Sequence, residues 1–248
     1  MEGYIPYVNT IATFITRRCY EQVAVDVCLH NLHVRLIGNG GGMVYAPLGP
    51  THMATDDIAI MRALPNMAVV APVDADDMKR FMARTPDWPG PIYIRLGKGG
   101  DKVVSREEDG FEIGKANLLR KTGEVLIVTT GVMASRALEA AETLGQEGIT
   151  CGVLNMHTVK PLDDKTLLDL AAKVKLVVTV EEHSRIGGLG SAVTDALVEN
   201  LGADLPAIHR IALPDVFPED YGSQDSLMQH YGLQPPEIAD AIRKKSQA

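Results

Sequence analysis

The chain has 248 residues, of which 46% are hydrophobic and 23% charged, and its formal net charge at pH 7 is -8. This composition is typical of a globular protein and excludes a disordered or collagen-like chain, and the length allows two ordinary domains. The acidic excess argues against broad binding to nucleic acid or to an anionic membrane. No apolar segment is long enough to cross a bilayer, and the first residues lack a signal-peptide pattern, so we expect a cytoplasmic protein.

In the first hundred residues, short apolar runs rich in strand-forming residues alternate with segments of helical period. We predict strands at 5–10, 33–39, 67–72 and 91–96, and helices at 12–30, 56–64 and 74–84, the last capped by Asp74. This order predicts a mainly parallel sheet covered by helices. Because the sequence opens on a strand, we expect an exposed sheet edge and a first domain that lacks its N-terminal portion.

Residues 101–122 are charged and contain glycines but show no helical period, which indicates a linker. Beyond the linker, strands are predicted at 124–131, 149–156, 175–183 and 207–215, and helices at 133–148, 163–174, 190–200 and 235–245. We therefore predict a two-domain α/β protein with domains at 1–100 and 123–248, each a mainly parallel sheet covered by helices.

The sequence contains no nucleophile elbow, P-loop, zinc-protease or dinucleotide-binding motif. Its three cysteines form no pair or Cys/His cluster at metal-ligand spacing, so no metal site is predicted within this chain and each cysteine is expected in the core. The glycines at 187–190 are expected to form a packing turn rather than an anion site. Glu181, Glu182 and His183 end a predicted strand and could exchange protons, but a hydrogen-bonded strand end or a subunit contact is favoured.

Two residues of the first domain are candidates for ligand binding. Phe14 lies off the apolar row of the predicted helix at 12–30, just after a strand, where an aromatic ring can stack on a flat heterocycle. His52 ends the glycine- and proline-rich run IGNGGGMVYAPLGPTH. On periodicity and spacing alone, ordinary packing for Phe14 and a structural turn for His52 are favoured.

Several motifs resemble those of one enzyme family. YVNTIATFITRRCYEQVAVDV, GPTHMATDDIAIMRALPNMAVVAPVDADDM and GPIYIRLGKGG are similar to the later part of the pyrimidine-binding domain of transketolases and 1-deoxyxylulose-5-phosphate synthases. EVLIVTTGVMASRALEAAETL, NMHTVKPLDDKTL and VVTVEEHSRIGGLGSAV resemble the transketolase C-terminal domain. The motifs cover nearly the whole chain and occur in the family order.

The resemblance implies a thiamine diphosphate enzyme that transfers a two-carbon ketol unit between sugars. Phe14 then matches the aromatic residue that stacks on the aminopyrimidine ring of the cofactor. His52 matches the catalytic histidine of GPTH, which faces the reacting carbon and hydrogen-bonds substrate oxygens. Lys98, in RLGK, falls where the family usually places an arginine for the substrate phosphate, and is the candidate for binding a substrate anion.

The sequence also departs from the family pattern. Pro47 and Leu48 stand where sugar-phosphate transketolases usually carry an acidic pair, and Gly40–Gly42 occupy the region that often holds a phosphate-contacting histidine. These two differences weaken the case for the standard phosphorylated ketose as substrate.

The glutamate that activates the cofactor and the GDG motif that holds the metal and diphosphate have no counterpart in this sequence. We therefore expect the chain to be inactive alone. It would require a partner, an N-terminal transketolase chain with GDG that holds Mg²⁺ or Ca²⁺, in a homodimer or heterotetramer, unless it is a fragment of a longer chain. The alternatives are a non-catalytic assembly or regulatory remnant and a 2-oxoacid dehydrogenase beta-type chain, although GPTH and RLGK fit transketolases better.

Overall fold

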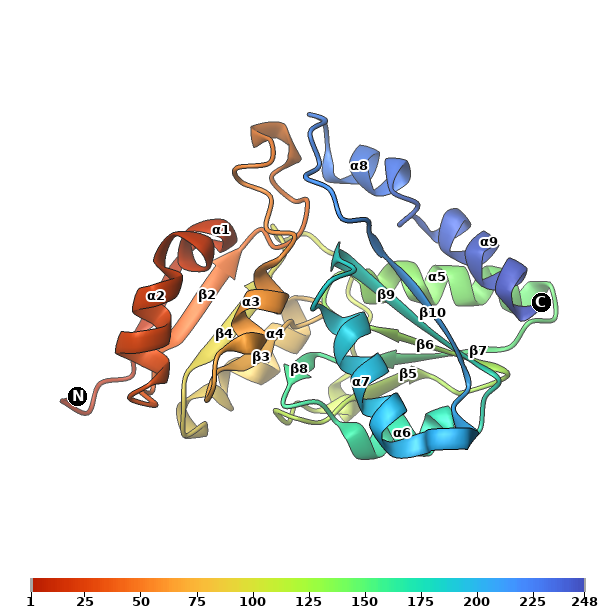
Figure 1. Cartoon of the computed structure of the whole chain (residues 1–248), viewed down its shortest axis with the longest axis horizontal. Helices are drawn as coiled ribbons and strands as arrows, with labels where there is room; N and C mark the ends of the chain where they lie inside the picture. Colours follow the sequence, from red (N-terminus) through yellow and green to blue (C-terminus); the bar gives the residue numbers. More distant parts are fainter. Residues whose placement is uncertain (1, 248) are drawn as a thin grey trace.

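A computed structural model describes residues 2–247 as two five-stranded sheets with helices on their faces (Figure 1). The first sheet has the order β1 (Tyr7–Ile11), β2 (Arg35–Asn39), β4 (Ile92–Leu96), β3 (Ala68–Val70) and β8 (Thr158–Lys160). The second has the order β10 (Ala207–Leu213), β9 (Leu176–Ser184), β6 (Val125–Thr129), β7 (Cys151–Asn155) and β5 (Asn117–Arg120). All pairs are parallel except β3 with β8 and β5 with β7, which confirms the predicted fold class.

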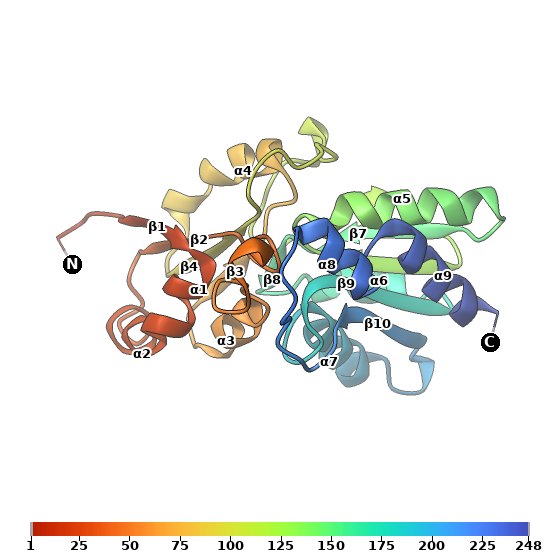
Figure 2. The same cartoon turned by 90° about the horizontal axis from the view of Figure 1, so that it is seen from above.

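Helices cover both faces of each sheet (Figure 2). Those of the first sheet are α1 (Ala12–Ile15), α2 (Tyr20–Gln22) and α3 (Asp57–Ala63) on one face and α4 (Ala75–Met82) on the other. On the second sheet, α5 (Met133–Gln146), α8 (Gln224–His230) and α9 (Pro235–Ser246) cover one face, and α6 (Asp164–Ala171) and α7 (Leu189–Leu201) the other. Asp74 caps α4 as predicted, because its Oδ1 accepts the Asp77 N–H at 2.9 Å.

The prediction of one continuous helix at 12–30 was wrong. After α1 the backbone leaves helical geometry at Thr16, and the chain continues as a 3₁₀ turn at Arg17–Cys19, α2, and a π-helical stretch at Val23–Cys28. The Thr16 hydroxyl donates to the Ala12 carbonyl at 2.7 Å, a local bond that competes with a regular helix. Cys28 and Cys151 are buried as expected, whereas Cys19 is only half-buried.

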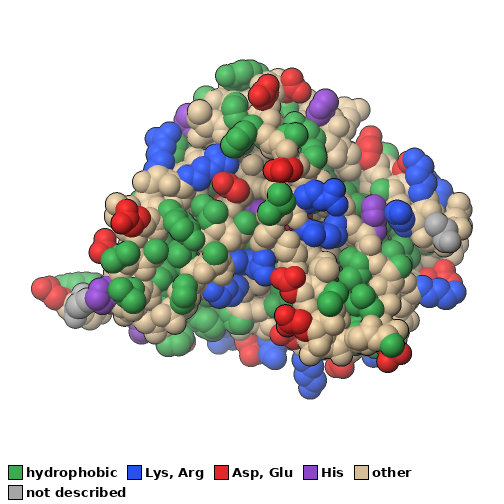
Figure 3. Space-filling view, viewed as in Figure 1, with side chains coloured by type: hydrophobic (Ala, Val, Ile, Leu, Met, Phe, Trp, Pro, Cys, Tyr) green, Lys and Arg blue, Asp and Glu red, His purple; other side chains and the backbone are tan. Residues whose placement is uncertain are grey.

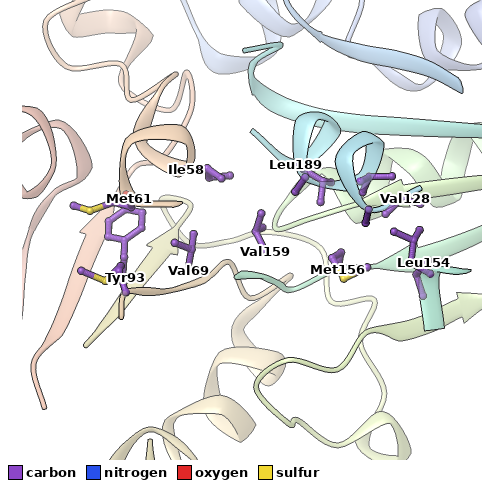
Figure 4. Close-up of a cluster of buried hydrophobic side chains, with 14 of the residues drawn as sticks. Ile58, Met61, Val69, Tyr93, Val128, Leu154, Met156, Val159 and Leu189 are labelled. Carbon is purple, nitrogen blue, oxygen red and sulfur yellow. The ribbon is translucent and has the colours of Figure 1, made fainter. Parts of the chain in front are cut away.

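The two halves of the chain contribute to one cluster of buried hydrophobic residues. Figure 4 shows Met61, Val69 and Tyr93 of the first half on one side and Leu154 of β7 on the other, with Val159 and Met156 between them. The three-residue strand β8, which was not predicted, carries the chain from the second half back onto the first sheet. This shared burial means that the two sheets pack as one body.

Two short strands do not follow the predicted division of the chain. β5 lies within 101–122 and pairs with β7 of the second sheet, while β8 lies beyond 122 and joins the first. The division into 1–100, 101–122 and 123–248 stays a prediction. At the other side of the first sheet, β1 is an edge strand, and Tyr7 and Val8 are 39% and 41% exposed.

None of the helices formed by residues 2–247 is both long and apolar enough to span a membrane.

Candidate active site

The candidate residues of the first half follow three parallel strands. β1, β2 and β4 run in the same direction, so their carboxyl ends meet at one edge of the sheet. Phe14 follows β1, the glycines at 40–42 follow β2, and Lys98 follows β4. Ligands of open α/β sheets commonly bind outside the carboxyl ends of the strands, so this edge is the candidate active site.

The side chains of Phe14 and His52 are in contact, although the two residues are 38 positions apart in the sequence. Their ring centroids are 5.3 Å apart at an interplanar angle of 62°, which is edge-to-face contact. The Thr51 hydroxyl and His52 Nδ1 are 2.9 Å apart and share a hydrogen bond. The Arg18 guanidinium covers the Phe14 ring, with Cζ 3.9 Å from the centroid. Because Arg18 is exposed, a flat ligand can replace it over the ring at little cost.

A 15-residue loop at 40–54, called here the histidine loop, carries His52. Its base is closed by two backbone hydrogen bonds between Gly42 and Ala54, at 2.8 and 2.9 Å. Two of its glycines are required by crowding: a Cβ on Gly40 would lie 2.1 Å from the Tyr45 ring and one on Gly42 2.4 Å from the Glu182 carboxyl group, and both residues have positive φ. The glycine run is therefore built for close packing at this site.

The far end of the histidine loop contacts Arg17, which follows α1, and Tyr221, which lies between β10 and α8. Arg17, next to α1, forms an ion pair with Asp56 at 2.7 Å and donates to the Pro50 carbonyl at 3.5 Å. A Cβ on Gly49 would lie 2.9 Å from the Tyr221 ring. Figure 3 shows apolar side chains at the end of the molecule where these segments project. Leu48, Val216, Phe217 and Tyr221 are exposed apolar residues of the two segments.

Lys98 lies at the same sheet edge but apart from the aromatic pair. It is exposed, in the loop after β4, and lines a cavity of about 230 Å³. The other lining residues are Asn39, 72–75, Met78, 96, 97, 99–101 and Val132, so neither Phe14 nor His52 borders it. The structure therefore brings Phe14 and His52 together and leaves Lys98 at a neighbouring cavity.

A buried charged network lies beneath the histidine loop and was not predicted from the sequence. Arg95 Nε donates to Asp57 Oδ2 at 2.9 Å, and the Tyr93 hydroxyl donates to the same oxygen at 2.7 Å. Arg95 Nη2 also donates to the Glu182 carbonyl at 2.8 Å, which joins the first sheet to β9. Burial opposes the Arg95 charge, but Asp57 and Glu182 more than offset this, and the pKa of Arg95 is raised. An arginine inside the apolar strand IYIRL was the available signal.

Glu181, Glu182 and His183 are fully buried at the end of β9, and their contacts confirm the hydrogen-bonded strand end. Glu181 accepts the N–H groups of Leu189 and Gly190 at 2.7 and 2.8 Å, so it occupies the N-terminus of α7 where an external anion would bind. This confirms the glycines at 187–190 as a packing turn. Burial raises the pKa of both glutamates.

The site fits one part of a heterocyclic cofactor. The half-buried Phe14 ring offers a stacking surface, and His52 lies beside it with polar ring atoms. Among residues 2–247, no three His, Cys, Asp or Glu side chains are grouped so that they could hold a metal ion. The residues present suit a flat ring.

Comparison with known proteins places these motifs in a family. Residues 1–100 match the transketolase pyrimidine-binding domain, and residues 114–238 match the transketolase C-terminal domain. A 6-deoxy-6-sulfo-D-fructose transketolase subunit, SqwH, from Clostridium sp. is 40% identical over 98% of this chain and 74% of its own length. A 1-deoxy-D-xylulose-5-phosphate synthase from Synechococcus sp. is 41% identical over the whole chain, which spans 38% of that protein.

Solved structures agree with the sequence matches. A split-gene transketolase, described as an inactive beta4 tetramer, superimposes with a TM-score of 0.89 and 37% identity, over 98% of this chain and 76% of that one. A transketolase from Pichia stipitis, only 19% identical, shares the fold with a TM-score of 0.77 over 97% of this chain and 34% of its own. The chain belongs to the transketolase family.

Proposed function

We propose that this chain is the C-terminal part, or subunit, of a thiamine diphosphate-dependent enzyme that transfers a two-carbon ketol unit between sugars. The observation that carries the proposal is the Phe14–His52 contact at the carboxyl edge of the first sheet, formed by the motifs that resemble the family's cofactor and substrate sites. Thiamine diphosphate, when bound, would supply a nucleophilic carbon that adds to the ketose carbonyl and an acceptor for the electron pair of the adjacent C–C bond when that bond breaks.

Each residue of the pair has a separate role in this proposal. Phe14 stacks on the aminopyrimidine ring and fixes its plane. His52 donates a hydrogen bond to the substrate oxygen on which negative charge develops, and Thr51 orients the imidazole through Nδ1. The edge-to-face contact supports these roles, because the imidazole lies beside the Phe14 ring on which the aminopyrimidine would stack.

The proposed substrate is a sugar with an anionic group. Lys98 is an exposed cation at the same sheet edge, and it would contact that group from the neighbouring cavity. SqwH, the Clostridium relative, is named for a sulfonated sugar, which supports an anionic but not necessarily phosphorylated substrate. Pro47 and Leu48 provide no carboxylate to bind substrate hydroxyls. The substrate specificity of the proposed enzyme should therefore differ from that of sugar-phosphate transketolases.

A partner chain completes the proposed active site. The sequence has no GDG motif, so Mg²⁺ or Ca²⁺ and the diphosphate would be held by an N-terminal transketolase chain that carries this motif. The words "subunit" and "split gene" in the names of two similar proteins support this arrangement. We propose a cytoplasmic homodimer or heterotetramer that is inactive without the partner.

Calorimetric titration of thiamine diphosphate and Mg²⁺ tests the proposal, with this chain alone and with a GDG-bearing partner. We expect tight binding and ketol transfer only in the complex. Tight binding by the isolated chain would contradict the need for a partner. Absence of ketol transfer with every partner tried would reject the enzyme, and acyl transfer to a lipoyl group would instead favour a 2-oxoacid dehydrogenase.

A further inference from the structure

The side chain of Glu182 reaches from the end of β9 into the base of the histidine loop. Its Oε1 accepts the backbone N–H of Met43 at 2.6 Å. The amide Nε2 of Gln224, at the start of α8, donates to both carboxylate oxygens at 3.0 Å. One buried carboxylate therefore connects the second sheet, α8 and the loop that carries His52.

The loop is shaped to meet this carboxylate. Gly42 has a φ of +70°, and a Cβ there would lie 2.4 Å from the Glu182 carboxyl carbon, so any side chain at this position would displace the contact. Met43, Ala46 and Met53 of the loop are buried in the same core cluster as Leu227 and Met228 of α8. The apolar contacts hold the loop on the second half, and the Glu182 bond fixes its backbone at a single point.

The charge of Glu182 is matched by its surroundings. Its carboxylate is fully buried, which would be unfavourable in isolation. The Arg95 guanidinium binds the carbonyl of the same residue at 2.8 Å, and Asp57 holds that guanidinium in place. The Met43 N–H and the Gln224 amide supply donors to the carboxylate. A residue supported in this way is a rigid reference point for the loop.

We infer that Glu182 is a positioning residue: it holds the histidine loop so that His52 stays in register with Phe14, and it makes this geometry depend on α8 through Gln224. The inference rests on the proposed function for its consequence in catalysis. Its structural half, the anchoring of the loop, does not. Glu182 itself touches neither Phe14 nor His52, so it acts only through the loop backbone.

Hydrogen–deuterium exchange of this chain tests the anchoring without any activity. Glu182→Leu removes the acceptor of the Met43 N–H, and we expect amides of residues 40–54 to exchange at least about tenfold faster. Glu182→Gln keeps an oxygen for Met43, while Gln224 can turn its own oxygen toward the new amide, so it should restore most of the protection. Unchanged exchange at 40–54 in Glu182→Leu would overturn the inference.

Glu181→Leu is the matched control, because Glu181 is the neighbouring buried carboxylate on β9 but bonds to α7. It should accelerate exchange in residues 189–201 and leave 40–54 as in the wild type. Equal acceleration at 40–54 would mean that any lost carboxylate loosens the loop, against the inference. If Glu182→Leu does not fold, exchange of the Met43 amide in the wild type decides, because an unprotected amide there rejects the anchor. Gln224→Leu then tests the link to α8, and an unchanged loop in that variant rejects this link alone.

Ketol transfer in the complex with a GDG-bearing partner tests the catalytic consequence. For Glu182→Leu we expect kcat per folded complex to fall about tenfold or more, with the KM for cofactor nearly unchanged and with recovery in Glu182→Gln. A loop that exchanges faster while kcat stays at the wild-type value would reject the positioning role. If the wild-type complex transfers no ketol unit, the proposed function fails, whereas the exchange result still stands for the anchor.

Discussion

At the carboxyl edge of the first sheet, Phe14 and His52 are only partly buried, and they meet edge to face with ring atoms available to a ligand. At the carboxyl end of β9 in the second sheet, Glu181, Glu182 and His183 are fully buried, and backbone N–H groups bond to all three side chains. Both regions lie at the carboxyl ends of parallel strands, and both carry ionisable groups. Position in an α/β sheet therefore indicates where a site can form, while burial and satisfied hydrogen bonds separate a ligand site from a structural one.

The largest effect is expected from breaking the buried Arg95–Asp57 ion pair, which Arg95 connects to the end of β9 through the Glu182 carbonyl. Arg95→Met leaves the Asp57 carboxylate buried without its cationic partner, and this should lower the free energy of unfolding by about 3 to 5 kcal/mol. Urea unfolding followed by circular dichroism measures the change. Tyr93→Phe, which removes only a neutral donor to Asp57, is the matched control and should cost about 1 to 3 kcal/mol. Equal effects of the two substitutions would contradict the assignment of a charged network.

The second largest effect is expected at His52, where a substitution should change turnover but not stability. His52→Ala should leave thermal stability nearly unchanged, because the imidazole is partly exposed and bonds only locally to Thr51. In the complex with a partner, it should reduce kcat by about 100- to 1000-fold if His52 stabilises developing charge. His30→Ala, an exposed histidine away from the sheet edge, is the control. Normal turnover in His52→Ala would favour a non-catalytic role for the chain.

Most of the architecture could be predicted from sequence patterns, and the predictions that failed did so for local reasons. Apolar runs and a helical period predicted the parallel strands and the long helices, because burial on both sheet faces imposes those patterns. The prediction of one continuous helix after β1 was wrong because the side chains of Thr16 and Cys19 donate hydrogen bonds to the backbone carbonyls of residues 12 and 15. These bonds compete with regular helical geometry. β8 has only three residues, and no periodicity can be measured over so short a segment.

The candidate site could be predicted only in part. Phe14 and His52 became candidates through family motifs, since periodicity alone favoured packing and a turn. Neither the family motifs nor the periodicity predicts that the two rings touch, because Phe14 and His52 follow different strands and meet only through the histidine loop. Arg95 in IYIRL signalled a buried partner, but Asp57 lies 38 residues away and no spacing rule connects them. Long-range pairing of this kind requires the folded structure.

A smaller effect tests whether the Phe14 ring is a binding surface. Phe14→Leu keeps an apolar side chain but removes the π face, so affinity for thiamine diphosphate in the complex should fall about threefold to tenfold by calorimetry. Arg18→Ala uncovers the same ring and should leave affinity unchanged or slightly improved. A loss in Arg18→Ala as large as that in Phe14→Leu would mean that the cation, and not the ring, binds the cofactor.

The smallest effect concerns Lys98, which lies outside the aromatic pair. Because its ammonium is exposed and screened by salt, Lys98→Ala should raise the KM for an anionic sugar only about threefold and leave kcat unchanged. Lys98→Arg should match or improve the wild type, since the guanidinium can bind an anion through two hydrogen bonds. Lys102→Ala, which removes a cation paired with Glu139 at 2.9 Å, is the control. An equal rise in KM for an uncharged sugar would show that Lys98 shapes the neighbouring cavity and does not recognise charge, and the ligand region would then be confined to the edge formed by Phe14 and His52.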